Sequence, residues 1–147
     1  MLEFDGEEWF DQPRDVVFDR LVDMNFMSRV IPDLDRAEVP EPGRLVCRVR
    51  PGFSFLRGKL DLVFVILEQG RPETIRYQSS AKGIGASVQV EVALALIDDG
   101  GNATKVQWKA KADQMTGLIK QISRGLLEAA AKKVIGDVWA SFGRELA

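Results

Sequence analysis

The sequence lacks or nearly lacks two side-chain types on which many catalytic and metal sites depend, histidine and cysteine. The 147 residues include no histidine and a single cysteine, Cys47. Without histidine the chain cannot form a Ser–His–Asp triad, a Cys–His dyad or a histidine-ligated metal site. A lone cysteine excludes an internal disulfide, and its place in an alternating pattern indicates a small buried apolar residue. The sequence therefore predicts no cofactor and no metal, and it favours a non-enzymatic protein over an enzyme.

Two short motifs look like ligand loops but lack the context that such loops require. Gly83, Ile84 and Gly85 would need a following helix to offer its N-terminus to a phosphate, and the residues that follow alternate as in a strand. Glycines that let a sheet bend explain this motif. The Asp98 and Asp99 pair lacks the further spaced carboxylates of a calcium loop and is typical of a hairpin turn.

Three polar side chains remain as candidates for acid–base chemistry or ligand binding. Glu8 falls on the same side of an N-terminal strand as two phenylalanines, where it would be a buried carboxylate with a raised pKa. A shift of one residue in the strand phase would move it to the surface. Tyr77 and Ser79 share one face of a later strand, and we expect them to be the polar groups of a ligand pocket.

Length and composition predict one soluble, cytoplasmic-type domain spanning residues 1–147. The chain is 46% hydrophobic and 29% charged, ordinary values for a globular protein, and its net charge of −2 argues against nucleic-acid binding. There is no signal-peptide pattern and no apolar run near the ~20 residues that a membrane-spanning helix needs. A lone cysteine fits a reducing compartment.

The basic residues between positions 105 and 133 have two interpretations. They could meet anionic lipid headgroups or an acidic protein partner, which would place the protein peripherally at the inner face of a membrane. They could instead pair with acids along a strand face and a helix face. The residues concerned are Lys105, Lys109, Lys111, Lys120, Arg124, Lys132 and Lys133.

Hydrophobic periodicity predicts the elements that would position these side chains. Apolar spacings of three and four residues predict one long helix over 116–146, with shorter helices from Pro13 to about residue 23 and over 25–31. Alternation predicts strands over 2–12, 34–39, 44–50, 53–68, 74–82, 84–97 and 104–112. This order, β-α-α-β-β-β-β-β-β-α, predicts an α+β fold in which a curved antiparallel sheet wraps around the C-terminal helix.

Two segments carry a resemblance to a known family. Residues 13–39 (PRDVVFDRLVDMNFMSRVIPDLDRAEV) and 83–142 (GIGASVQVEVALALIDDGGNATKVQWKAKADQMTGLIKQISRGLLEAAAKKVIGDVWASF) resemble the SRPBCC (START / birch-pollen-allergen-like) superfamily. The most similar branch is typified by CoxG, a subunit of carbon monoxide dehydrogenase. The chain departs from that branch at Asp33, where the branch has glycine after proline. The resemblance implies a helix-grip fold with a ligand cavity of ~300–1,000 Å³ between sheet and helix.

We expect this cavity to be lined by aromatic and methionine side chains, which adapt to irregular ligands, together with aliphatic residues of the long helix. The predicted lining residues are Phe26, Met27, Ile31, Phe55, Tyr77, Ser79, Trp108, Met115, Ile119, Ile122 and Leu126.

The resemblance implies binding of a hydrophobic small molecule such as a lipid, a quinone or a polyketide-like compound. It also implies a role as a carrier or adaptor for a partner oxidoreductase or a membrane. Two alternatives remain open: a polyketide cyclase/dehydratase-like enzyme that uses Tyr77 or Glu8, and a structural interaction module whose core is filled. The sequence does not predict an oligomeric state.

Overall fold

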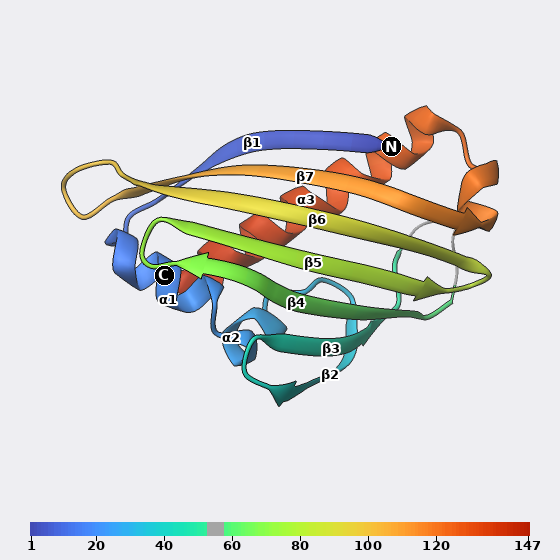
Figure 1. Ribbon diagram of the computed structural model, residues 1–147, viewed down its shortest axis with the longest axis horizontal. Helices are drawn as coiled ribbons and strands as arrows, with labels where there is room; N and C mark the ends of the chain where they lie inside the picture. Colours follow the sequence, from blue (N-terminus) through green and yellow to red (C-terminus); the bar gives the residue numbers. More distant parts are fainter. Residues whose placement is uncertain (53–57) are drawn as a thin grey trace.

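The computed structural model describes residues 1–52 and 58–147. Its elements are β1 (Leu2–Phe10), α1 (Arg14–Leu21), α2 (Met24–Ser28), β2 (Leu34–Glu41), β3 (Arg44–Val49), β4 (Leu60–Gly70), β5 (Thr74–Gly83), β6 (Ala86–Asp98), β7 (Thr104–Gly117), the 3-10 helix η1 (Leu118–Gln121) and α3 (Arg124–Leu146). The strands form a single antiparallel sheet in the order β1-β7-β6-β5-β4-β3-β2, and α3 runs diagonally across one face of it (Figure 1). The predicted α+β helix-grip fold is confirmed.

Alternating side chains define an inner face of the sheet, which faces α3, and an outer face. On β3, Leu45, Cys47 and Val49 are buried, while the residues between them are partly exposed. Burial, together with the charge of nearby Asp61, raises the pKa of the Cys47 thiol to about 11, so the thiol stays protonated. This confirms the interpretation of Cys47 as a small apolar core residue.

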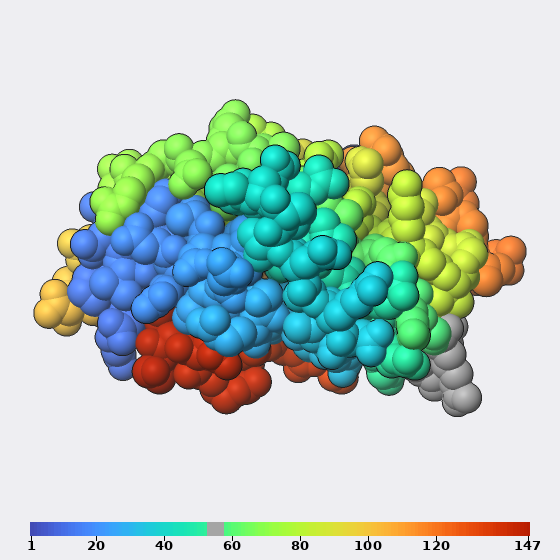
Figure 2. Space-filling view, turned by 90° about the horizontal axis from the view of Figure 1, so that it is seen from below, coloured from blue at the N-terminus to red at the C-terminus, as the bar shows by residue number. Residues whose placement is uncertain are grey.

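An aromatic part of the core lies where α2 and the end of α3 meet β1. Phe142 of α3 is fully buried, and its ring makes edge-to-face contacts with Phe10 at 5.2 Å and Phe26 at 5.6 Å between ring centroids. Trp139 completes the group at 5.9 Å. In the space-filling view the C-terminal part of α3 (red) lies beside the α1–α2 segment (blue) (Figure 2). Aromatic packing therefore joins both ends of the chain.

The predicted helix over 116–146 begins too early. β7 continues to Gly117, which pairs with Ala86, and η1 follows before α3 starts at Arg124. Gly117 has a φ of 73°, in the region that favours glycine, and Ser123 caps α3 by accepting a hydrogen bond from the Leu126 N–H at 3.3 Å. Spacings of three and four residues over 118–122 suit a 3-10 turn as well as an α-helix, and this ambiguity explains the error.

Other predicted boundaries differ by smaller amounts. The second short helix ends at Ser28 rather than at residue 31, and β1 ends at Phe10 rather than at residue 12. The start of the predicted strand over 53–68 lies outside the described residues, and β4 begins at Leu60. Asp33 adopts a φ of 58°, so an aspartate takes the left-handed conformation at the position where the branch has glycine.

Candidate functional site

The inner face of the sheet is closed at one end and partly open at the other. In the cross-strand row of Ile75, Leu94 and Trp108, the first two residues are only 1% and 4% exposed. Four residues further along the strands, the paired residues Val90 and Ala112 are only half-buried. Apolar inner-face side chains in this second part therefore remain in contact with open space. We call this part the half-exposed strip, and it comprises Phe4, Leu62, Val88, Val90 and Ala112.

α3 does not seal the half-exposed strip. Of its 23 residues only Phe142, near the C-terminal end, is buried. Leu127, Ala131 and Ile135 share a helix line with Phe142, because they precede it by 15, 11 and 7 residues. All three are half-buried. The helix is therefore fully buried against the core at Phe142 and less buried toward its N-terminal end.

An open hollow of about 580 Å³ lies at the N-terminal end of α3. A register shift between Ser87 and Gln89 and a φ of 47° at Gln114 mark an irregularity in the β6–β7 pairing beside it. Leu2, which pairs with Ala112 of the half-exposed strip, also lines the hollow and so joins the two. The residues that line the hollow are Met1, Leu2, Asp113, Gln114, Met115, Ile119, Lys120, Ile122, Arg124 and Leu127.

The predicted lining residues separate into two groups. Met115, Ile119 and Ile122 come together in the hollow. Phe26 and Tyr77 instead belong to the buried core, with Met27, Ile31 and Trp108 packed against it. Ser79 is 9% exposed on the inner face. Phe55 lies outside the described residues.

Leu126 was expected to line the cavity, but it does not face the sheet. It is 42% exposed, and its neighbour Leu127 lines the hollow in its place. Phe142 is the buried residue of α3, so it fixes which side of the helix faces the core. That orientation turns position 127 toward the sheet and position 126 toward solvent.

Tyr77 has a structural role rather than that of a free polar group. Its hydroxyl donates a hydrogen bond to the Leu21 carbonyl oxygen at 2.5 Å, in a fully buried position at the end of α1. Burial raises the pKa of the Tyr77 hydroxyl far above its ordinary value of 10.0. The bond ties α1 to the centre of the sheet and uses the hydroxyl that the enzyme alternative would need.

Replacing Tyr77 with phenylalanine should lower the free energy of unfolding by about 1–2 kcal/mol, because the Leu21 carbonyl would lose its buried partner. Urea unfolding at neutral pH measures the effect. If stability were unchanged, the hydrogen bond would not be what holds α1 on the sheet.

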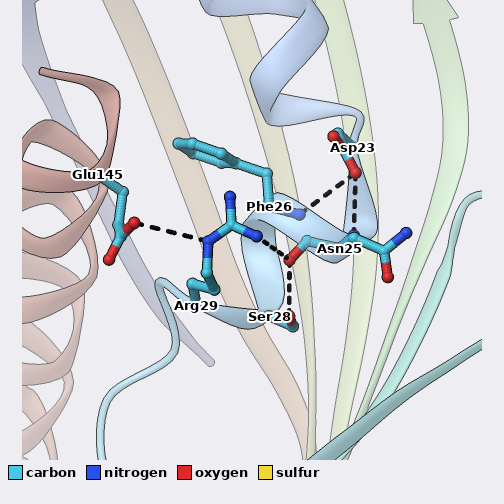
Figure 3. Close-up of polar contacts among 6 residues, drawn as sticks. All are labelled: Asp23, Asn25, Phe26, Ser28, Arg29 and Glu145. Carbon is cyan, nitrogen blue, oxygen red and sulfur yellow. Dashed lines mark hydrogen bonds and ion pairs between the residues drawn. The ribbon is translucent and has the colours of Figure 1, made fainter.

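α2 carries a polar cluster next to the buried aromatic group (Figure 3). The Asp23 carboxylate accepts hydrogen bonds from the backbone N–H groups of Asn25 and Phe26 at 3.0 and 3.2 Å, and so caps the helix. The Arg29 guanidinium lies 5.2 Å from the centroid of the Phe26 ring and 3.6 Å from the Glu145 carboxylate of α3. These contacts fix α2 against α3 and do not form a ligand site.

Trp108 lies flat against β1. A Cβ atom at Gly6 would come within 2.6 Å of the indole ring, so only glycine leaves room for the ring there. The indole Nε1–H is fully buried and has no hydrogen-bond partner among the described residues. Trp108 therefore closes the β1 side of the core beside the half-exposed strip.

Two of the basic residues on the outer face of β7 are paired with acids of β1. Lys105 lies 3.7 Å from Glu7, and Lys111 lies 3.8 Å from Glu3. On α3, Arg124 pairs with Glu128 at 3.0 Å, and Lys133 pairs with Asp137 at 2.8 Å. Exposed pairs of this kind contribute little to stability.

Comparison with known proteins identifies the family. Residues 6–147 match the CoxG family of carbon monoxide dehydrogenase subunits. The chain belongs to the CoxG family. No curated protein matches the chain closely enough to add a more specific relationship.

Solved structures share the fold of this CoxG-family chain. A conserved protein from Geobacillus kaustophilus has a TM-score of 0.89 at 19% identity, covering 99% of this chain and 95% of its own. A START superfamily protein from Mycobacterium smegmatis has a TM-score of 0.73 at 7% identity, covering 98% and 96%. Ara h 8.0201 has a TM-score of 0.70 at 13% identity, covering 99% and 97%. At these identities the likeness shows the fold alone, which is the predicted START-like fold of the SRPBCC superfamily.

The described part of this CoxG-family chain contains no helix long and apolar enough to cross a membrane. Across the same residues, no three His, Cys, Asp or Glu side chains gather in a way that could hold a metal ion.

Glu8 faces inward, as the predicted strand phase requires, while its neighbour Trp9 is 61% exposed on the other face. Desolvation raises the pKa of the Glu8 carboxyl above its ordinary value of 4.5. The folded protein therefore binds this proton more tightly than the unfolded chain does. The resulting stability is fully present below pH 4.5 and is lost as the pH rises through the raised pKa.

A Glu8→Gln variant should remove this pH dependence. Near pH 7 it should be more stable than the unaltered protein, and the advantage should shrink as the pH falls toward about 4. Urea unfolding at several pH values measures the difference. An advantage that stayed constant with pH would contradict a raised pKa at Glu8.

Sequence reasoning missed the aliphatic residues of the half-exposed strip. Alternation placed Val88 and Val90 on the correct face of β6. The predicted lining instead favoured aromatic residues such as Phe26 and Tyr77, which proved to fill the core. The size of an apolar side chain indicates that it is buried. Whether a ligand can reach it depends on how far along the sheet α3 packs closely, and no single residue of the sequence determines this.

Proposed function

We propose that this CoxG-family protein binds a hydrophobic small molecule, such as a lipid, a quinone or a polyketide-like compound, between the sheet and the N-terminal half of α3. The observation that supports the proposal is the half-exposed strip of apolar side chains, continuous with the open hollow of about 580 Å³. A hollow of this size falls within the range of small-molecule pockets, ~300–1,000 Å³.

Hydrophobic burial provides the driving force for such binding. Apolar surface in contact with water costs roughly 25 cal/mol per Å², so a ligand that covers the strip from Val88 to Ala112 gains free energy without specific polar contacts. The strip and the facing residues of α3 are mainly aliphatic. They favour flexible or flat apolar ligands over strongly polar ones.

A role as a carrier or adaptor is consistent with an open site. The hollow is accessible at the N-terminal end of α3, so a ligand can enter and leave without unfolding the Phe142 core. Family membership supports a partner oxidoreductase as the protein that supplies or receives the ligand, or a membrane as its source. Such a carrier requires no catalytic group.

The alternatives receive less support from the geometry. The enzyme alternative would depend on Tyr77, whose hydroxyl is engaged by the Leu21 carbonyl, or on Glu8. The filled-core alternative fits the packing around Tyr77 and Phe142 but not the half-exposed strip.

Native mass spectrometry of protein purified from its source tests the proposal. We expect an apolar molecule to remain bound, and we expect its re-addition to delipidated protein to raise the thermal midpoint. At a ligand concentration of 100 times Kd, the stabilisation should be about 2.7 kcal/mol. Absence of a bound molecule, together with no thermal shift from lipids or quinones, would contradict the proposal.

A further inference from the structure

The polar side chains of the inner face differ in whether their hydrogen bonds are already made. The Tyr77 hydroxyl donates to the Leu21 carbonyl, and the Thr104 hydroxyl donates to the Gln12 carbonyl at 2.7 Å. Both residues thus serve the attachment of α1. Ser79 has no side-chain hydrogen bond to any other described residue. The Trp108 Nε1–H also lacks a partner, but it is fully buried against Gly6.

Ser79 lies beside the half-exposed strip rather than in the closed core. It pairs with Phe64 on β4 and with Val90 on β6, and Val90 in turn pairs with Ala112 on β7. Ser79 is 9% exposed, so it is largely enclosed by these neighbours but keeps a small accessible surface. A buried hydroxyl surrounded by apolar side chains is costly unless it finds a partner.

The same cross-strand row leads from Ser79 to the hollow. It runs through Val90 and Ala112 to Leu2 on β1, which lines the hollow. Three strand spacings separate Ser79 from Leu2, a distance of about 14 Å. The residues between them are small or aliphatic and half-buried. A chain-like molecule that enters at the hollow and lies along this row would reach the hydroxyl with its far end.

We propose that Ser79 binds the polar end of the ligand, and that this end carries one uncharged oxygen, as in an alcohol or a ketone. This inference rests on the proposed function, because it assigns an orientation to a ligand in the same site. The inner face of the sheet carries no charged side chain along four strand segments. These are Leu60–Ile66 of β4, Ile75–Ala81 of β5, Ala86–Leu96 of β6 and Thr104–Ala112 of β7, whose charged residues all lie on the outer face. An ionised group buried beside Ser79 would have no counter-charge there.

Two ten-carbon compounds separate the hydrogen bond from hydrophobic burial. Binding of 1-decanol and of n-decane is measured by displacement of Nile red from the unaltered protein, from Ser79→Ala and from Ser80→Ala. Ser80 follows Ser79 on β5 but lies on the outer face, so it is the matched control. We expect Ser79→Ala to weaken 1-decanol binding about three- to tenfold, the usual value of one neutral hydrogen bond. Decane binding should be unchanged in both variants.

Each other outcome contradicts one part of the account. If Ser79→Ala bound 1-decanol as tightly as the unaltered protein, Ser79 would not bind the polar end of the ligand, while the proposed function would still stand. Equal losses for decanol and decane would also overturn it, because a change in packing would then explain them. A Ser79→Cys variant, which keeps the shape but has a weaker donor, should show an intermediate loss for 1-decanol alone. If neither compound bound the unaltered protein, the proposed function itself would fail.

Discussion

Replacing Phe142 with alanine is expected to lower the free energy of unfolding by about 3–5 kcal/mol, the usual cost of deleting a fully buried phenylalanine ring. Phe142 contacts Phe10 of β1, Phe26 of α2 and Trp139 of α3, so its loss opens a cavity where three elements meet. Urea unfolding followed by tryptophan fluorescence measures the change.

Val134→Ala on the same helix is the matched control. Val134 is 39% exposed, and its truncation should cost under about 1 kcal/mol. If the two variants lost equal stability, α3 would not be anchored at its C-terminal end. The explanation for the open strip under its N-terminal half would then fail as well.

Filling the half-exposed strip should abolish ligand binding without unfolding the protein. In Ala112→Phe a ring would occupy the space between Val90 and Leu2, and we expect affinity for an apolar ligand to fall at least about tenfold. Because the ring would enter existing space, stability should stay within about 1 kcal/mol of the unaltered protein. Dye displacement and urea unfolding give the two measurements.

Ala93→Phe provides the control for this substitution. Ala93 lies on the outer face of β6 between Arg76 and Lys109 and is exposed, so a ring there should leave binding unchanged. If the strip were instead a solid core, the new ring of Ala112→Phe would be overpacked. The free energy of unfolding would then fall by about 1–3 kcal/mol, and the filled-core alternative would be favoured.

The fold could be predicted because its determinants are local and repeated. Alternation along β6 from Val88 to Leu96 fixes the inner face, and glycine-rich turns such as Gly100 and Gly101 force antiparallel neighbours. The start of α3 could not be predicted in the same way. Residues 118–122 have the same apolar spacing whether they form η1 or α-helix, and the β6–β7 pairing up to Gly117 decides between them.

The candidate site was predicted less well than the fold, for a physical reason. The predicted lining residues Met115, Ile119 and Ile122 lie together in one hollow, because they are near one another in sequence. Whether Phe26 or Tyr77 lines a space or fills it depends on how closely α3 approaches the sheet. That approach is set by the aromatic contacts of Phe142, which are distant in sequence and cannot be read from periodicity.

The central claim is that an apolar molecule binds in the half-exposed strip. Methyl-resolved NMR during titration with 1-decanol tests it most directly. We expect the methyl signals of Val88, Val90 and Leu127 to shift, while those of Ile75 and Leu94 in the closed core do not. Shifts confined to Val65 on the outer face, or no shifts at saturating ligand, would contradict the claim.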